Sequence, residues 1–364
     1  MTLAIVGAVA AQFFLPRDAG VSAKSPRTPT ASVENAKPDS PPVSAPAGEL
    51  TKLSSALEQA CRDDITLDQD YEPIYSGSYA EWQSTVADQL ADSSSPEHLH
   101  LAALMASEPA QRLELITRAV DAAPAEPFIL WSAVRLCRGH ADTGCPLDDW
   151  LDRLTLADSE NSLVWSQLAM HRHQGGDKAA ALDALRRGAS STSANSYWID
   201  TVMLSAQSLA AATNLSFLQR VNLGFGISAA QVPAYGDLAN TCTAEASDPA
   251  WAFTCIDFGR QLELEARSEL GNAFGLVLQQ RGFEALGDAE AADKARERQN
   301  ARRQRMQDAR EVQVENAFLL ISASPSLFEA YLERIRSEGE IAGAISFNKD
   351  LRAFREQRPD LACY

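Results

Sequence analysis

The stretch PFILWS (residues 127–132) aligns with NSLVWS (residues 161–166) when the chain is shifted by 34 residues. Trp131 and Trp165 therefore occupy equivalent positions. A self-match at this interval is typical of arrays of helix–turn–helix repeats, in which each helix pair buries its apolar side against the next pair. The sequence therefore predicts an all-α solenoid of stacked antiparallel helix pairs.

The second copy, residues 161–194, has large and small residues and a turn glycine at regular positions: Trp165, Leu168, Ala169, Gly176, Ala181 and Leu185. With these residue sizes at its packing and turn positions, the copy resembles the tetratricopeptide repeat family. Two positions depart from the family pattern, because Arg172 replaces an aromatic residue or leucine and Thr192 replaces a terminating proline. The first copy, residues 127–160, departs further. The family pattern is therefore well kept only in the second copy.

The resemblance implies a groove that holds another polypeptide. It covers residues 127–198, and elsewhere it concerns the helical architecture alone. Arg138 and Arg172 are 34 residues apart and fall in register. We therefore expect both arginines to face the groove.

Weaker apolar periodicity extends through a helical body that spans residues 49–364. Helices are expected at residues 49–62, 96–105, 109–122, 199–213, 215–223, 229–246, 250–267, 268–286, 289–316, 326–337 and 340–357. Gly287-Asp288 repeats the turn chemistry of Gly176-Asp177. Gly224-Phe225-Gly226 is expected to be a loop between helices. Residues 71–79, rich in tyrosine and turn formers, predict a packed loop, with a tyrosine-lined ligand patch as the alternative.

The chain is strongly acidic, with a formal net charge of −17. Residues 1–48 contain four basic and three acidic groups, so the body that follows carries −18. Such a surface repels phosphate backbones, and nucleic acid is therefore disfavoured as a partner.

Six cysteines occur, and none has the spacing of a metal site: Cys61, Cys137, Cys145, Cys242, Cys255 and Cys363. An even number of cysteines without metal spacing favours disulfide bonds and an oxidising compartment. The pairs closest in sequence are Cys137 with Cys145 and Cys242 with Cys255, which leaves Cys61 for Cys363. Fifteen pairings are formally available to six cysteines. The alternative is a cytosolic protein with buried free thiols.

The amino terminus predicts export or anchoring. Residues 3–16 form an uncharged apolar run. As a helix this run rises about 21 Å, which is shorter than a bilayer core of about 30 Å. We therefore read residues 1–16 as a signal peptide or membrane anchor, although basic residues follow this run rather than precede it. Residues 17–48, rich in proline, serine and alanine, predict an extended linker. Together they place the body on the periplasmic or extracellular side, secreted or tethered to a membrane.

No set of residues in the sequence points to a cofactor, a metal or a catalytic centre. All five histidines lie between residues 98 and 173. His98 with His100, and His171 with His173, are two residues apart on expected helices, so each pair of rings points about 200° apart. Because zinc-binding helices need spacings of three or four residues, we interpret these histidines as surface or groove side chains.

Residues 294–310 carry seven basic side chains against two acidic ones. The simpler interpretation is a solvated helix face whose charges pair with acidic neighbours. The alternative is a docking stripe for an acidic partner or for lipid headgroups, centred on Arg302, Arg303 and Arg305.

The sequence thus leaves two hypotheses of different class. The first is a non-enzymatic extracytoplasmic scaffold or adaptor, whose groove binds an unknown peptide or protein partner. The second is an enzyme built as a helical toroid, which acts on a cell-envelope substrate through dispersed acidic residues. The repeat and the predicted tether favour the first.

Overall fold

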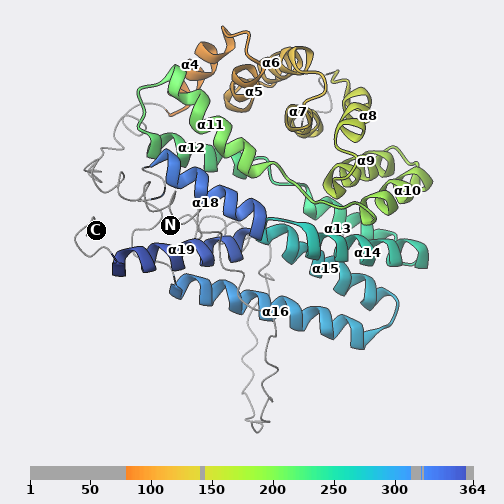
Figure 1. The fold of residues 1–364 in the computed structure, drawn as a ribbon. Coiled ribbons are helices and arrows are strands. Elements are labelled where there is room, and N and C mark those ends of the chain that lie inside the picture. Colours follow the sequence, from red (N-terminus) through yellow and green to blue (C-terminus); the bar gives the residue numbers. More distant parts are fainter. Residues whose placement is uncertain (1–78, 140–143, 313–320, 322–323, 358–364) are drawn as a thin grey trace, which may run out of the picture. The chain divides into compact units, whose positions relative to one another are not determined.

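The computed structural model describes residues 79–139, 144–312, 321 and 324–357, and these residues form an all-α fold (Figure 1). Fifteen helices occupy the described ranges. Extended pairing in these ranges is limited to two isolated bridges. The predictions for residues 1–16, 17–48 and 49–62, for the loop up to residue 78, and for a Cys61–Cys363 bond lie outside the described residues.

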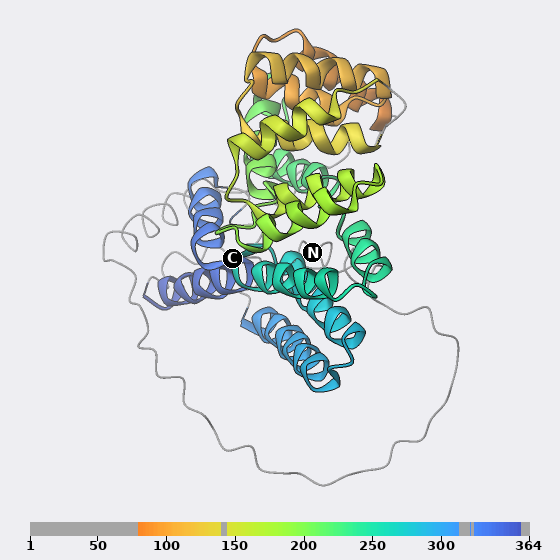
Figure 2. The ribbon, with the colours of Figure 1, turned by 90° about the vertical axis from the view of Figure 1, so that its right-hand side faces the viewer.

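The helices of the first half follow one another through short connections. They are α4 (Tyr79–Ala91), α5 (Pro96–Met105), α6 (Pro109–Ala122), α7 (Pro127–Gly139), α8 (Leu147–Ala157), α9 (Ser162–Gln174) and α10 (Lys178–Ala189). Successive helices pack against each other, and Figure 2 shows them, from orange to lime, in successive layers. This half has the stacked, solenoid-like arrangement that the sequence predicts, with the two aligned copies at α7–α8 and α9–α10.

The second half continues with longer helices. They are α11 (Trp198–Ala212), α12 (Phe217–Ala229), α13 (Tyr235–Ala244), α14 (Pro249–Glu265), α15 (Glu269–Ala285), α16 (Ala289–Val312), α18 (Pro325–Glu338) and α19 (Glu340–Gln357). None of the helices in the described ranges is both long and apolar enough to cross a membrane.

The predicted recurrence of a Gly-Asp turn is confirmed. Gly176 and Gly287 have positive φ angles of 85° and 74°, a region that favours glycine. The side chains of Asp177 and Asp288 then each accept a hydrogen bond from the backbone N–H three residues later, at 3.0 Å. Each turn therefore ends one helix and caps the next.

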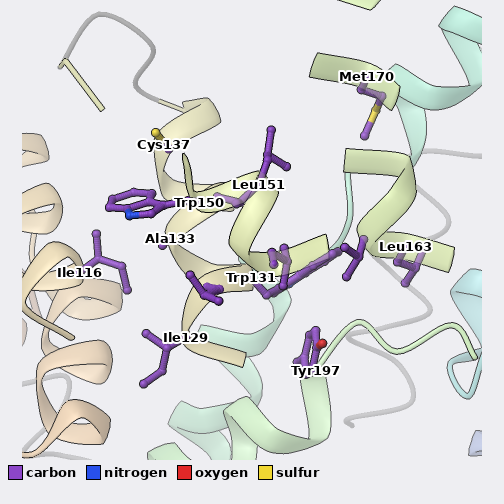
Figure 3. Packing of buried hydrophobic residues seen from close by; sticks show 14 of the residues in the cluster. Ile116, Ile129, Trp131, Ala133, Cys137, Trp150, Leu151, Leu163, Met170 and Tyr197 are labelled. Atoms are coloured by element: carbon purple, nitrogen blue, oxygen red, sulfur yellow. The ribbon is translucent and has the colours of Figure 1, made fainter. Parts of the chain in front are cut away.

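The two aligned tryptophans differ in their surroundings. Trp131 is 1% exposed and packs with Tyr197 at a ring separation of 5.7 Å; Figure 3 shows both in the core, with Leu163 near them. Trp165 is half-buried, donates to the Ser159 carbonyl at 2.7 Å, and lies under the Arg187 guanidinium. The shared position therefore supports the core in one copy and a surface junction in the other.

Asn161 fastens two consecutive connecting segments together. Its side-chain oxygen caps α9 at Leu163 N and also accepts from Asn195 N, at 3.1 and 3.0 Å. Its side-chain nitrogen donates to the Asn195 carbonyl and to Asp158, both at 2.8 Å. Asn161 is fully buried. One side chain thus joins positions that are 34 residues apart.

The departure at Thr192 has a structural reason. The Thr192 N–H donates to the Glu160 carbonyl at 3.2 Å, and its hydroxyl donates to the Glu160 carboxylate at 2.9 Å. Proline has no N–H and could not make the first of these bonds.

The predicted loop at Gly224-Phe225-Gly226 is wrong, because α12 runs through it. A Cβ atom on Gly224 would lie 2.9 Å from the Val202 carbonyl oxygen of α11. Glycine here permits a close helix crossing instead of a chain break. The helix expected at 229–246 is present as α13 but begins later than predicted, because residues 230–234 connect α12 to α13.

The pair α11–α12 leaves the linear order of the stack. Helix α11 packs against α5 and α4, whereas α13 packs against α9 and α14 against α10. The stack that ends at α10 is therefore continued by α13 and α14, with α11–α12 folded back along the earlier helices (Figure 1).

Two of the predicted disulfide bonds are present. Cys137 in α7 is bonded to Cys145 just before α8, and Cys242 in α13 is bonded to Cys255 in α14. The two bonds indicate an oxidising compartment.

The interpretation of His100 as a surface or groove residue is wrong. Its ring is fully buried in α5 and packs edge-on against Phe128 at 4.5 Å, and neither of its nitrogens has a hydrogen-bond partner among the described residues. Burial lowers the pKa of His100 to about 3. The native protein therefore holds a neutral imidazole at physiological pH.

Replacing Asn161 by alanine should lower the free energy of unfolding by about 2–4 kcal/mol, because a helix cap is lost and buried backbone groups lose their partners. The matched control is Asn195→Ala, at the equivalent but exposed position, which should cost less than about 1 kcal/mol. Chemical denaturation measures both. Equal losses would contradict the role given to Asn161.

His100 makes stability depend on pH. Its folded pKa lies below the unfolded value, so its contribution is complete above pH 6.5 and declines as the pH falls towards 3. His100→Leu should remove about 1 kcal/mol of the stability loss between pH 7 and 5.5, and should raise stability at pH 7 by about 1 kcal/mol. Denaturation curves at the two pH values test this, and an equal loss of stability in the variant and the native protein would contradict it.

Candidate functional site

A cavity of about 550 Å³ lies where α7, α8 and α9 meet α13. Its lining comes from four helices and the segments next to them: Arg135, Cys137, Arg138, Gly139, Cys145, Leu147, Asp148, His171, Gln174, Ala234 and Asp237. The volume falls within the range of small-molecule sites. Helices far apart in sequence build this cavity, because α13 returns to the side of α9.

Two arginines that lie one turn apart on α7 supply positive charge to the cavity. Arg135 donates to the Val232 carbonyl at 2.5 Å, and Arg138 donates to the Gln167 side-chain oxygen at 2.8 Å. Burial is the main cause that lowers the pKa of both groups, and Asp237 acts in the opposite direction. Guanidinium groups stay charged even so. Each is therefore a largely buried cation whose described hydrogen-bond partners are uncharged.

Two buried N–H groups beside these arginines have no acceptor among the described residues. They are Nε of Arg135 and Nε2 of Gln167, the residue whose oxygen already binds Arg138. Buried donors without a partner are costly and uncommon. The described residues therefore place no hydrogen-bond acceptor within reach of these two N–H groups.

Two helices begin at the cavity. Leu147 and Ala234, at the starts of α8 and α13, both line it, and neither helix has a side-chain cap at its N-cap residue. The positive ends of both helix dipoles are therefore directed to the same region.

The acidic groups at the cavity differ in how they are neutralised. The Asp148 carboxylate lies 2.9 Å from His171 and 3.6 Å from Arg172. Asp237 is exposed and forms no ion pair with any described residue. Among the described residues that line the cavity, two arginines thus face two carboxylates, and of these carboxylates Asp148 is paired with Arg172.

The two candidate groove residues, Arg138 and Arg172, lie in different surroundings. Arg138 lines the cavity, whereas Arg172 is half-buried beside it and pairs with Asp148 and Asp152 of α8. The repeat register therefore located one cavity residue. Arg135 and Asp237 were missed. Arg135 is one turn before Arg138 on the same helix face, a signal that was available, but only the fold brings α13 and its Asp237 to α7.

The remaining described histidines take part in separate contacts. His98 lies 3.0 Å from the Ser93 hydroxyl, and His173 lies 3.0 Å from Glu245, which also binds Lys178. Both hydrogen bonds lower the pKa of Glu245. Among the described residues no group of three or more potential metal ligands converges.

The three arginines of the proposed docking stripe on α16 differ in their contacts. Arg302 donates to Glu269 and to Asn272, each at 2.6 Å, and is only 19% exposed. Burial raises the pKa of Glu269 while Arg302 lowers it. Arg303 and Arg305 are exposed and form no ion pair among the described residues. Arg302 thus joins α16 to α15, and only the other two arginines present their charges to solvent.

Glu340 also contacts Glu269, and it holds α19 against the start of α15. The Glu340 carboxylate, at the start of α19, accepts from the Glu269 backbone N–H at 2.8 Å, and its own N–H donates to the Arg267 carbonyl. Burial raises the pKa of Glu340. This cluster is therefore a structural junction of α15, α16 and α19.

Arg302→Gln should lower the free energy of unfolding by about 2–4 kcal/mol, because it leaves Glu269 buried without its counter-ion. Arg303→Gln, one residue further on the same helix, should change stability by less than about 0.5 kcal/mol. Urea denaturation distinguishes the two. A stable Arg302 variant would restore the stripe as a free surface.

No family model matches the chain. No curated protein and no solved structure matches it either. A function must therefore be inferred from the chain's own residues and their arrangement.

Proposed function

We propose that this protein is an extracytoplasmic interaction scaffold, whose tetratricopeptide-like helix pairs hold a segment of a peptide or protein partner. The observation that carries the proposal is the cavity at the junction of α7, α8, α9 and α13. It presents Arg135 and Arg138 from within a body of charge −18. A local positive site in an acidic protein selects partners by the placement of their negative groups.

The arrangement favours recognition over turnover. Both sulfur atoms at the cavity belong to the Cys137–Cys145 disulfide, so neither is a thiolate nucleophile. Asp148 is held by His171 and Arg172. The groups that are left for a ligand are guanidiniums, helix amides and one carboxylate, which are groups that bind and orient.

The proposed extracytoplasmic location rests on the amino-terminal residues and on the cysteines. The two disulfide bonds support an oxidising location. We further propose that residues 1–16 direct export or tether the protein to a membrane, and that residues 17–48 space the helical body from that tether.

The proposal predicts a partner whose capture depends on Arg138. The full chain would be used to capture proteins from an extracytoplasmic extract of the source cells, with cross-linking and mass spectrometry as the readout. Arg138→Glu should reduce recovery of the specific partner by about tenfold or more, since one charge pair becomes a repulsion. Arg186→Glu, exposed on α10 and outside the cavity lining, is the control of equal charge change.

A partner recovered equally by both variants would place the interaction elsewhere on the body. Recovery of no protein above the background that is measured without the chain would overturn the scaffold proposal. Thermal unfolding of each variant confirms that the helical body is intact before capture.

A further inference from the structure

The chemistry of the cavity identifies the group that it takes. Its strongest donors are two guanidiniums, Arg135 and Arg138, whose hydrogen-bond acceptors among the described residues are all uncharged. Two buried N–H groups, on Arg135 and on Gln167, have no acceptor among the described residues. Guanidinium groups can only donate, so the ligand group that matches these two arginines is one that can only accept, which means an anion.

The helix ends give the same sign independently. The starts of α8 and α13 both reach the cavity, and neither carries a side-chain cap. Backbone amides at a helix start bind anions because the helix dipole is positive there. Two helices that are not neighbours in sequence therefore add to the field of the arginines at one place.

The charge balance selects among anions. The described lining of the cavity carries two arginines and two carboxylates, Asp148 and Asp237, and Asp148 is paired with Arg172. A monoanion places one negative charge beside the two guanidiniums. A phosphate dianion would place two there and would face the carboxylates of Asp148 and Asp237 at short range. The planar guanidinium fork also matches the geometry of a carboxylate.

We propose that this cavity is a binding site for a single carboxylate group, held by Arg135 and Arg138 beneath the starts of α8 and α13. Two sources carry this chemistry, a small organic acid and a carboxylate of a bound polypeptide. A cavity of about 550 Å³ accommodates either one. The second source rests on the proposed scaffold function, whereas the first does not.

Isothermal titration of the full chain tests the proposal with four probes: hexanoate, tri-alanine with a free carboxyl terminus, tri-alanine amide and inorganic phosphate. We expect saturable binding of hexanoate or of free tri-alanine, and binding of both amide and phosphate that is weaker by about tenfold or more. Hexanoate alone indicates a small-molecule ligand. Free tri-alanine in preference to hexanoate indicates a polypeptide carboxylate.

Three variants separate this site from adventitious binding. Arg138→Gln should weaken the carboxylate by about tenfold or more, and Arg186→Gln should leave it unchanged. Asp237→Asn removes the opposing charge from an exposed position, so it should strengthen binding by about threefold. This opposite sign cannot come from partial unfolding.

The proposal is overturned if neither carboxylate binds saturably, if phosphate binds more tightly than both, or if Arg138→Gln and Arg186→Gln behave alike. Weaker binding in Asp237→Asn would also overturn it, because the site would then favour a cation. Failure of partner capture with intact binding of hexanoate would remove the scaffold function and leave the carboxylate site in place.

Discussion

The Asn161 side chain meets the constraint on which the rest of this fold depends. Where helix pairs stack closely, their connecting segments are buried, and every backbone N–H and carbonyl in them needs a partner. Asn161 satisfies groups of its own segment and of the segment at Asn195. The second segment in turn bridges to Ala266, ahead of α15. Connections that would otherwise be the weakest parts of the stack thus become a continuous hydrogen-bonded seam.

The seam also directs the chain back towards its earlier helices. Just after it, Tyr197 packs on Trp131 and Phe128 of α7, and α11 then lies along α5 and α4. Because α11–α12 occupies that side, the chain comes back with α13 beside α9. This return brings Val232 within reach of Arg135. The cavity is therefore a product of the departure from regular stacking, and a uniform array of identical repeats would not contain it.

These relations explain how far the sequence could be interpreted. Local signals gave the all-α class, most helix limits, the Gly-Asp turns and two disulfide bonds, because each depends on residues close together in the chain. They failed at Gly224 and His100, where packing against another helix decides the role of the residue. The register identified Arg138 as a candidate, since it follows the repeat. Asp237 reaches the cavity through long-range folding that no local pattern encodes.

The contrast between two sets of arginines separates structure from recognition in this acidic protein. On α16, Arg302 binds Glu269, and Arg298 binds Glu263, so these charges are neutralised inside the chain. At the cavity, the hydrogen-bond acceptors of Arg135 and Arg138 among the described residues are a carbonyl and an amide, and Asp237 acts on both charges without forming an ion pair with either. A buried cation without an ion pair lowers the stability of the fold, and a chain with 49 acidic residues could have placed a glutamate beside it. Two largely buried cations that form no ion pair with any described residue are most simply explained by a counter-ion that another molecule brings.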